Sequence, residues 1–341
     1  MTAGRLVFHI GSLKTGTTAI QAALDRDRAR LAAHGIHYPA TTPEFSPTRS
    51  AHHRVAHAVA DLGLRNRIGL TLFFRRLRRQ AADYRLTLLS AEPVYRHVAF
   101  RPPPRESDAW FEGRAVYLNR LRNYLRDFDT QILLYLRRPH DYAVSLYKEA
   151  LTKTRSTRMP AFADMVEDYA PHFEYPRHLA LLKERFGKVE VRGYEVEAAK
   201  GLVPAFYARL GLEAPPAEGR RMRVSVSNRA VAWLSARSGE GSPPEQRRRI
   251  FYAARDPDAI FHEAEPSTLW PSEDVFERFG ARHAQTYDME IMGAPPDFSG
   301  RPCIWTRQMQ TEADARFLDW RAENLAMLKA REAKGLRHFH D

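Results

Sequence analysis

The chain has 341 residues, of which 44% are hydrophobic, so it can build a sizeable core and is not a disordered chain. Its single cysteine excludes an intramolecular disulfide, and no run reaches the roughly twenty apolar residues of a membrane-spanning helix. The 53 Lys and Arg against 41 Asp and Glu give a net charge of +12, which favours anionic ligands.

The first predicted elements are a short buried strand over residues 6–10 and a helix that opens at Thr17, joined by a glycine-and-hydroxyl turn. Gly11 and Gly16 permit backbone angles that other residues resist. Such a turn aims backbone N–H groups and a helix N-terminus at one point, where phosphate binds well. Lys14 adds a mobile positive charge. We therefore predict a phosphate-binding loop with contacts from Gly11, Ser12, Lys14, Thr15, Gly16, Thr17 and Thr18.

The next segments predict helices around a loop. An amphipathic helix is expected over residues 17–34, ending at Gly35. Residues 38–50, rich in Pro, Thr and Ser, predict a loop that borders the cleft, and helices are expected over about 51–82.

A second apolar strand is predicted over residues 84–90, with Ser90 and Glu92 at its C-terminal end. In an open parallel sheet, ligands bind beyond the carboxyl ends of the strands. Glu92 is therefore expected to face the same cleft as Lys14. Pairing with a nearby arginine, or a cap ahead of the following proline, is the alternative role for this carboxylate.

The histidines do not predict a metal site. His52, His53 and His57 fall on a predicted helix, but no glutamate stands between them and no cysteine partners follow. We expect these three to form a solvated or acceptor-facing surface. A buried, hydrogen-bonded position is expected for His9 on the first strand.

A break at Arg101-Pro-Pro-Pro-Arg105 precedes a helix predicted around 108–127, and a third buried strand is predicted over 131–137. Pro139 suits the start of the following helix, which leaves Arg137 at the end of the strand. Ser145 comes eight positions later, a spacing that lets its hydroxyl and the guanidinium converge on one anion. A solvated ion pair or a helix cap is the alternative reading of such an arginine.

A strand over residues 188–194 is predicted to end in Tyr194, and a helix over 205–210 closes on Gly211. A purely structural role, in which Tyr194 packs against the end of the strand, explains the presence of this tyrosine equally well. Beyond residue 212 the patterns predict short helical pieces, an amphipathic helix near 271–288 and a charged helix over 311–335.

The position of the lysine separates two kinds of phosphate loop. In nucleoside triphosphatases the lysine follows the second glycine directly, whereas Lys14 stands two places before Gly16. The order His-Ile-Gly-Ser-Leu-Lys-Thr-Gly-Thr-Thr over residues 9–18 instead resembles the loop of sulfotransferases that use 3′-phosphoadenosine 5′-phosphosulfate (PAPS), above all their bacterial branch. The later arginine, serine and tyrosine are similar to motifs of the same family, so the resemblance covers residues 5–212 in order.

The resemblance implies a P-loop-like sulfotransferase fold of the α/β class, with a central parallel sheet in a three-layer α/β/α arrangement. One sulfotransferase domain is expected over 1–341, with a motif-bearing core over about 5–212 and a helical C-terminal region over about 213–341. It also implies an enzyme that transfers the sulfuryl group of PAPS to a hydroxyl or amine without a metal, leaving adenosine 3′,5′-bisphosphate. A carbohydrate or glycoconjugate is the expected acceptor.

Roles for the residues follow from the same resemblance. The loop would hold the 5′-phosphate, Lys14 would neutralise charge on the bridging oxygen, and Tyr194 would lie near the nucleotide. Arg137 and Ser145 would hold the 3′-phosphate. Glu92 would accept the acceptor's proton, because carbohydrate sulfotransferases commonly use a glutamate as base. In the family a later region adds nucleotide and acceptor contacts, for which Asn228 and Arg229 are candidates.

Two other functions remain open: a kinase or other phosphotransferase, and a noncatalytic protein that binds a nucleotide or glycan. The basic clusters over 75–79 and 220–223 come with no nucleic-acid recognition fold, so we expect a solvated helix face or the rim of an anionic acceptor site, and no nucleic-acid partner. The first strand begins within about five residues of Met1, leaving no room for a signal peptide, and a cytoplasmic enzyme without a membrane span is expected. The oligomeric state cannot be predicted.

Overall fold

The computed structural model describes residues 4–12, 14–40, 51–100, 105–153, 160–216, 226–257, 259–262, 267–286, 289–296, 298 and 301–333. Its contacts divide the chain into two compact units. The first comprises Met1–Tyr142, Asp168–Gly219 and Arg282–Pro295, and the second comprises Ala143–Glu167, Arg220–Ala281 and Pro296–Asp341. A single domain over 1–341 stays a prediction.

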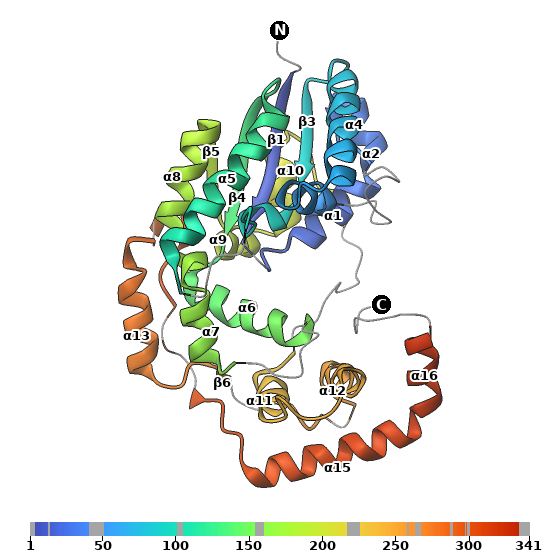
Figure 1. The fold of residues 1–341 in the computed structure, drawn as a ribbon, viewed down its shortest axis with the longest axis vertical. Coiled ribbons are helices and arrows are strands. Elements are labelled where there is room, and N and C mark those ends of the chain that lie inside the picture. The colour runs from blue at the N-terminus through green and yellow to red at the C-terminus, as the bar shows by residue number, and fades with distance from the viewer. Residues whose placement is uncertain are drawn as a thin grey trace. The chain divides into compact units, whose positions relative to one another are not determined.

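The first unit is built on a five-stranded parallel sheet in the order β2-β3-β1-β4-β5 (Figure 1). Its strands are β1 (Arg5–Gly11), β2 (Ile36–His37), β3 (Leu86–Ser90), β4 (Asp129–Leu136) and β5 (Lys188–Gly193). The strand order reverses at β1, so β3 lies on one side of it and β4 on the other. In such sheets the ligand crevice lies outside the carboxyl ends of the strands at this reversal.

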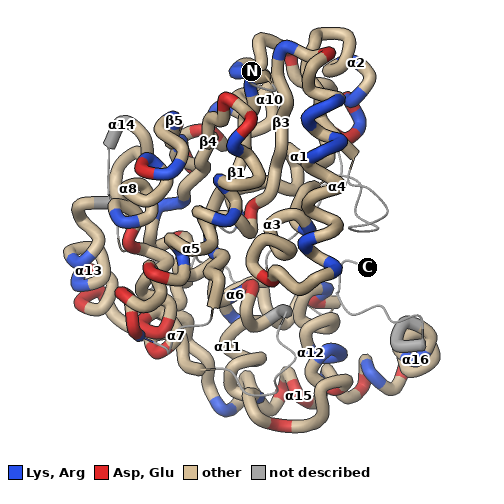
Figure 2. The backbone as a smooth tube through the Cα atoms, turned by 45° about the horizontal axis from the view of Figure 1, so that its top comes forward, with Lys and Arg blue, Asp and Glu red and all other residues tan. Residues whose placement is uncertain are grey.

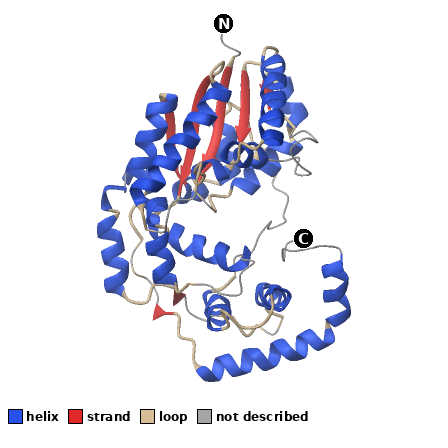
Figure 3. Ribbon diagram, in the orientation of Figure 1, coloured by secondary structure: helices blue, strands red, loops and turns tan. Residues whose placement is uncertain are grey.

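Helices cover both faces of the sheet, which confirms the predicted α/β class with a central parallel sheet (Figure 3). Successive residues of β1 point to opposite faces, and Leu6, Phe8 and Ile10 on one face are fully buried while Val7 on the other is 8% exposed. The apolar cluster around Val7 includes side chains of α1 (Thr17–Arg26), α2 (Arg28–Ala33) and α10 (Leu202–Arg209).

The opposite face is covered by longer helices. Helix α8 (Tyr175–Phe186) contacts β4 and β5, and α5 (Ser107–Leu125) contacts α8, α3 (His53–Ala60) and α4 (Leu64–Ala81). Short elements complete this unit: η1 (Glu92–Tyr95), η2 (Ala170–Phe173), η3 (Ala284–Thr286), α9 (Tyr194–Ala199) and α14 (Met289–Met292).

Several predicted boundaries move. The predicted helix over 17–34 divides at Asp27 into α1 and α2, and Gly35 then adopts a left-handed φ of 69° as expected. The strand expected over 84–90 begins at Leu86. Tyr194 does not end a strand, because β5 stops at Gly193 and Tyr194 opens α9. Residues 41–50 of the predicted loop lie outside the described residues.

The second unit is mainly helical. It contains α11 (Asn228–Ala236), α12 (Pro243–Arg255), α15 (Arg307–Glu323) and α16 (Leu325–Ala333), with most of α6 (Pro139–Lys153), α7 (Phe162–Asp168) and α13 (Glu273–Arg282). Strands β6 (Ser267–Thr268) and β7 (Arg301–Pro302) form a two-stranded parallel pair. The helix expected over 311–335 is therefore two helices, and the helix near 271–288 is α13 followed by a short turn.

Aromatic rings form the centre of the second unit. Trp233 is fully buried, with Phe261 at 5.3 Å and Tyr252 and Phe317 each at 5.7 Å between ring centroids. Its indole Nε1 donates to Asp314 Oδ1 at 3.0 Å. Across both units, the described helices include none whose length and apolar character would carry it through a bilayer.

Candidate functional site

The predicted phosphate loop joins the end of β1 to the start of α1. It folds back on itself, because Thr15 Oγ1 donates to Ser12 O at 2.9 Å and Ser12 N donates to Tyr135 O on β4 at 2.9 Å. Lys14 and Gly16 adopt left-handed φ angles of 63° and 66°. A left-handed lysine is uncommon, so the loop imposes a backbone that this residue does not prefer. Leu13 lies outside the described residues.

The two loop glycines are needed for different reasons. At Gly11 a Cβ atom would lie 2.6 Å from Thr15 Oγ1 and 3.0 Å from Tyr135 O, so the constraint is space. At Gly16 the left-handed φ already disfavours other residues, and a Cβ would overlap Leu202 and lie 3.4 Å from the ring of Tyr194. These close approaches bring the loop backbone against both β4 and the residues that follow β5.

Three of the loop's four hydroxyl groups are engaged within the protein. Ser12 Oγ accepts the backbone N–H of Arg137 at 3.0 Å, Thr15 is bound to Ser12, and Thr17 Oγ1 donates to Glu92 Oε2 at 2.5 Å. Within the described part of the chain, the Thr18 side chain has no hydrogen-bond partner. Among the described residues, Thr18 is therefore the one loop hydroxyl that the protein itself does not engage, and anion binding by Thr15, Thr17 and Thr18 stays a prediction.

Glu92 opens the η1 turn just past the end of β3. Its neighbour Ala91 donates a backbone N–H to His9 O at 2.9 Å, which continues the pairing of β3 with β1. The half-buried carboxylate then meets Thr17 at the first turn of α1. The sheet thus brings Glu92 to the predicted phosphate loop, as expected for a residue at the carboxyl end of a parallel strand.

A buried polar network holds the end of β3 beneath Glu92. Ser90 Oγ lies 2.9 Å from His9 Nδ1 and accepts Gln21 Nε2 at 3.0 Å. The Ser90 backbone N–H donates to His52 Nδ1 at 3.0 Å, so His52 carries its proton on Nε2 and donates it to Pro39 O at 3.0 Å. Both histidine rings are therefore structural.

The structure corrects the prediction for one histidine and supports another. His52 is 1% exposed and not part of a solvated surface, because its two ring nitrogens tie β3 to the segment after β2. Burial lowers the pKa of His52 to about 3 and that of His9 to about 3, so both are neutral near pH 7. His9 is buried and hydrogen-bonded, as predicted. His57 is exposed and its Nδ1 lies 2.7 Å from Nε2 of His97.

Arg137 lies directly after β4 and is anchored on three sides. Its backbone N–H reaches the loop through Ser12, its carbonyl accepts the Tyr175 hydroxyl at 2.7 Å, and its Nε donates to Glu195 Oε1 at 3.1 Å. The guanidinium lies over the ring of Tyr194, with 5.1 Å from Cζ to the centroid. This arginine is therefore placed and oriented by the ends of two neighbouring strands.

Ser145 lies on α6 in the part of the chain that belongs to the second unit. Its pairing with Arg137 on one anion stays a prediction. Tyr194, in contrast, belongs to the first unit. Its ring lies close to Gly16, and the guanidinium of Arg137 lies over the same ring.

Sequence reasoning missed Glu195. This carboxylate accepts Arg137 Nε at one oxygen and the backbone N–H of Arg138 at the other, at 3.1 and 3.2 Å. The sequence does contain a signal for this ion pair. Strands β4 and β5 are parallel neighbours, and an arginine follows β4 while a glutamate comes shortly after β5. Gln21, which links Ser90 to α1, was missed as well, and nothing in its local pattern distinguishes it from an ordinary helix residue.

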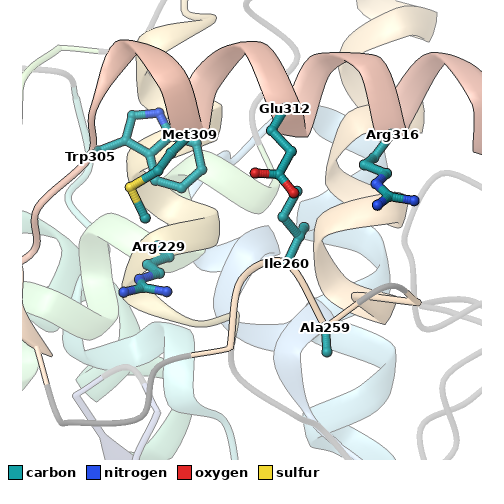
Figure 4. Close-up of a pocket in the computed structure, with 7 residues that line it drawn as sticks. All are labelled: Arg229, Ala259, Ile260, Trp305, Met309, Glu312 and Arg316. Carbon is teal, nitrogen blue, oxygen red and sulfur yellow. The ribbon is translucent and has the colours of Figure 1, made fainter.

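The second unit holds a pocket of about 310 Å³ (Figure 4). It lies between α15, the start of α11 and the turn at residues 259–260, and contains the candidate Arg229. Arg229 donates to His262 O at 2.8 Å, and Ala259 has a left-handed φ of 51°. The lining residues are Arg229, Ala259, Ile260, Trp305, Met309, Glu312 and Arg316.

The described residues contain no group of three or more His, Cys, Asp or Glu side chains that could hold a metal ion. No protein-family model matches the sequence. No curated protein matches it. Among solved structures, the chain is similar to a protein described as the sulfotransferase domain from the curacin biosynthetic pathway. The two are 12% identical with a TM-score of 0.35, and the match covers 84% of this chain and 98% of that chain. A likeness this weak does not indicate a function.

Proposed function

We propose that the chain is a sulfotransferase that uses PAPS as its donor and a hydroxyl or amine, most simply of a carbohydrate or glycoconjugate, as its acceptor. One observation carries the proposal. A phosphate-type loop with Lys14 two residues before its second glycine touches a carboxylate on one side, through Thr17 and Glu92, and an arginine on the other, through Ser12 and Arg137. A phosphate-type loop, a carboxylate and a guanidinium thus lie together where β1, β3 and β4 end, which supports the proposal.

The residues present fit a phosphorylated nucleotide. Gly11 and Gly16 let the loop backbone pack closely against Thr15, Tyr135 and Leu202, which fixes the turn that leads into α1. The N–H groups at the start of a helix attract anions. Those N–H groups with Thr18 would hold the 5′-phosphate. Arg137 would hold the 3′-phosphate, with Ser145 as the expected second ligand.

When bound, PAPS supplies an activated sulfuryl group. Glu92 would take the proton of the acceptor's nucleophilic group, and its hydrogen bond with Thr17 holds the carboxylate in place for that task. The Lys14 ammonium would stabilise negative charge that develops on the phosphate oxygen as the sulfuryl group leaves.

Thermal unfolding with added nucleotides tests the donor. Adenosine 3′,5′-bisphosphate should raise the melting temperature more than AMP or ATP with magnesium, because only the first ligand offers a 3′-phosphate to Arg137. Transfer of label from PAPS to a panel of glycan, lipid and phenol acceptors then tests the reaction. Clear binding of the bisphosphate without turnover of any acceptor would favour the noncatalytic function.

The pair Thr17 and Glu92 supports a second candidate, a nucleotide-dependent phosphotransferase. A hydroxyl and a carboxylate side by side at a phosphate loop are oxygen ligands of the kind that Mg²⁺ takes in phosphoryl-transfer sites. This function requires a larger stabilisation by ATP with magnesium than by the bisphosphate. The same unfolding experiment therefore separates the two candidates.

A further inference from the structure

The outward side of helix α4 carries three large aliphatic side chains in one line. Leu64 is 75% exposed, Ile68 is 52% exposed and Leu72 is 49% exposed. Their spacing of four residues places them one above the other on a single side of the helix. Single exposed leucines are ordinary on protein surfaces, whereas three in register form a continuous apolar strip. We call Leu64, Ile68 and Leu72 the α4 strip.

The α4 strip is not needed to hold the helix in the first unit. The opposite side of α4 buries Leu70, Phe73, Phe74, Leu77 and Ala81, all at most 2% exposed. Packing on that side explains why α4 folds where it does, and it leaves the exposed strip without a structural role among the described residues.

The charge of α4 is of one sign. Its 18 residues include six arginines and no aspartate or glutamate. Of these, Arg78 pairs with Asp127 at 2.8 Å, and Arg76 lies over the ring of Phe73 at 5.9 Å. Four arginines of α4 are exposed, and Figure 2 draws all Lys and Arg in blue; they are Arg65, Arg67, Arg75 and Arg79. By helical spacing, Arg65 and Arg67 lie to either side of the strip, whereas Arg75 and Arg79 continue its line toward the C-terminal end of the helix.

We propose that α4 docks the protein on the surface of an anionic lipid bilayer. The helix lies in the plane of the interface, with the α4 strip at the acyl boundary and the long side chains of the exposed arginines reaching headgroup phosphates. Six arginines in 18 residues exclude a spanning helix, so this contact is peripheral. The proposal is independent of the sulfotransferase function.

The composition of the surface favours a bilayer over two other partners. A nucleic acid offers phosphates to the arginines but no counterpart for three adjacent aliphatic side chains. A second copy of this chain, meeting α4 through a two-fold axis, would bury the strip but bring arginines of like charge together. Of these three partners, only an anionic bilayer complements both the apolar strip and the positive charge.

Cosedimentation with vesicles tests the proposal on the full chain. The protein should sediment with vesicles of phosphatidylcholine plus phosphatidylglycerol, sediment less with phosphatidylcholine alone, and lose binding as salt rises. The variant L64S/I68S/L72S should bind the anionic vesicles at least about tenfold more weakly, as should R75Q/R79Q. The matched control I304S/L318S removes two equally exposed aliphatic side chains of the second unit and should bind like the wild type.

A labelled residue reports the contact directly. Cys303 is the only cysteine, so I68C in a C303S background carries one environment-sensitive label. Its emission should shift to shorter wavelength on addition of anionic vesicles, while the label at L318C in the same background should not respond. The melting temperature of L64S/I68S/L72S should match the wild type, since these side chains are exposed.

Three results would overturn the proposal. The first is vesicle binding that survives L64S/I68S/L72S unchanged, and the second is equal binding to neutral and anionic vesicles. The third is a concentration-dependent dimer, seen by sedimentation velocity without lipid, that L64S/I68S/L72S abolishes, because it would assign the strip to a second copy of the chain.

Discussion

In the first unit, the polar groups of the site are held by hydrogen bonds at the carboxyl ends of parallel strands, whereas the second unit is held by aromatic rings packed around Trp233. Ser12 and Arg137 follow directly on β1 and β4, and Glu92 comes one residue after β3 ends; these strands pair in a fixed register. The second unit has only one two-residue strand pair among its described residues. Functional side chains that are positioned by strand pairing can therefore be predicted from where the strands end in the sequence. A pocket that is formed by side-chain packing cannot be predicted in this way.

The largest expected effect tests whether the second unit depends on its aromatic centre. Trp233→Ala should lower the free energy of unfolding of that unit by about 3–5 kcal/mol, because it leaves a large cavity and removes the hydrogen bond to Asp314. Calorimetry should show the loss, and Trp233→Phe should lose less. The affinity for adenosine 3′,5′-bisphosphate, measured where both units are folded, should change little. A parallel loss of affinity would break the comparison.

The next effect concerns Lys14. Lys14→Ala should lower turnover by roughly a hundredfold to a thousandfold, because the ammonium meets charge that grows only in the transition state. Nucleotide affinity should fall far less, since loop N–H groups supply most of the phosphate contacts. Calorimetric titration and steady-state rates measure both, with Lys200→Ala, an exposed lysine of the same unit, as control. Equal losses in rate and affinity would make Lys14 a binding residue.

Glu92 is expected to contribute slightly less. Glu92→Gln keeps the shape of the side chain but removes its capacity as a base, so turnover should drop by about a hundredfold with nucleotide affinity intact. The exposed Glu112→Gln is the matched control. A near-native rate for Glu92→Gln would pass the role of base to His53 or His57. If Glu92→Gln instead lowers a magnesium-dependent activity with ATP, the result favours the phosphotransferase function.

The smallest effect sharpens the comparison within the first unit. Arg137→Ala should remove a charge-assisted contact of about 1.5–3 kcal/mol and with it the preference for adenosine 3′,5′-bisphosphate over AMP. Glu195→Gln should weaken the same preference less, because it frees the guanidinium from its partner but leaves Tyr194 beneath it. If Arg137→Ala retains the preference, Arg138 or the second unit must hold the 3′-phosphate.

The predictable part of this molecule is local. Gly11, Gly16 and Thr17 mark the loop and the start of α1 because glycine and hydroxyl residues have strong positional preferences. That Glu92 and Arg137 lie at the same edge of the sheet follows from parallel pairing alone. Both inferences use only a few neighbouring residues and one general property of sheets.

The remainder depends on contacts between residues that are distant in the sequence. The bond from Thr17 to Glu92 and that from Arg137 to Glu195 join side chains on different strand ends, and neither residue signals its partner. The burial of His52 depends on Pro39 and Ser90 lying on either side of its ring. The division between α1 and α2 at Asp27 is not signalled by a proline or glycine in the sequence.

The residues 282–295 return to the first unit after the chain has built much of the second. A Cβ at Gly193 would overlap the backbone carbonyl of Ile291, so the last residue of β5 packs against a segment synthesised about a hundred residues later. A nascent chain leaving the ribosome cannot complete its first unit when residue 212 emerges. The C-terminal end of β5 therefore stays without its α14 contact while much of the second unit is being made.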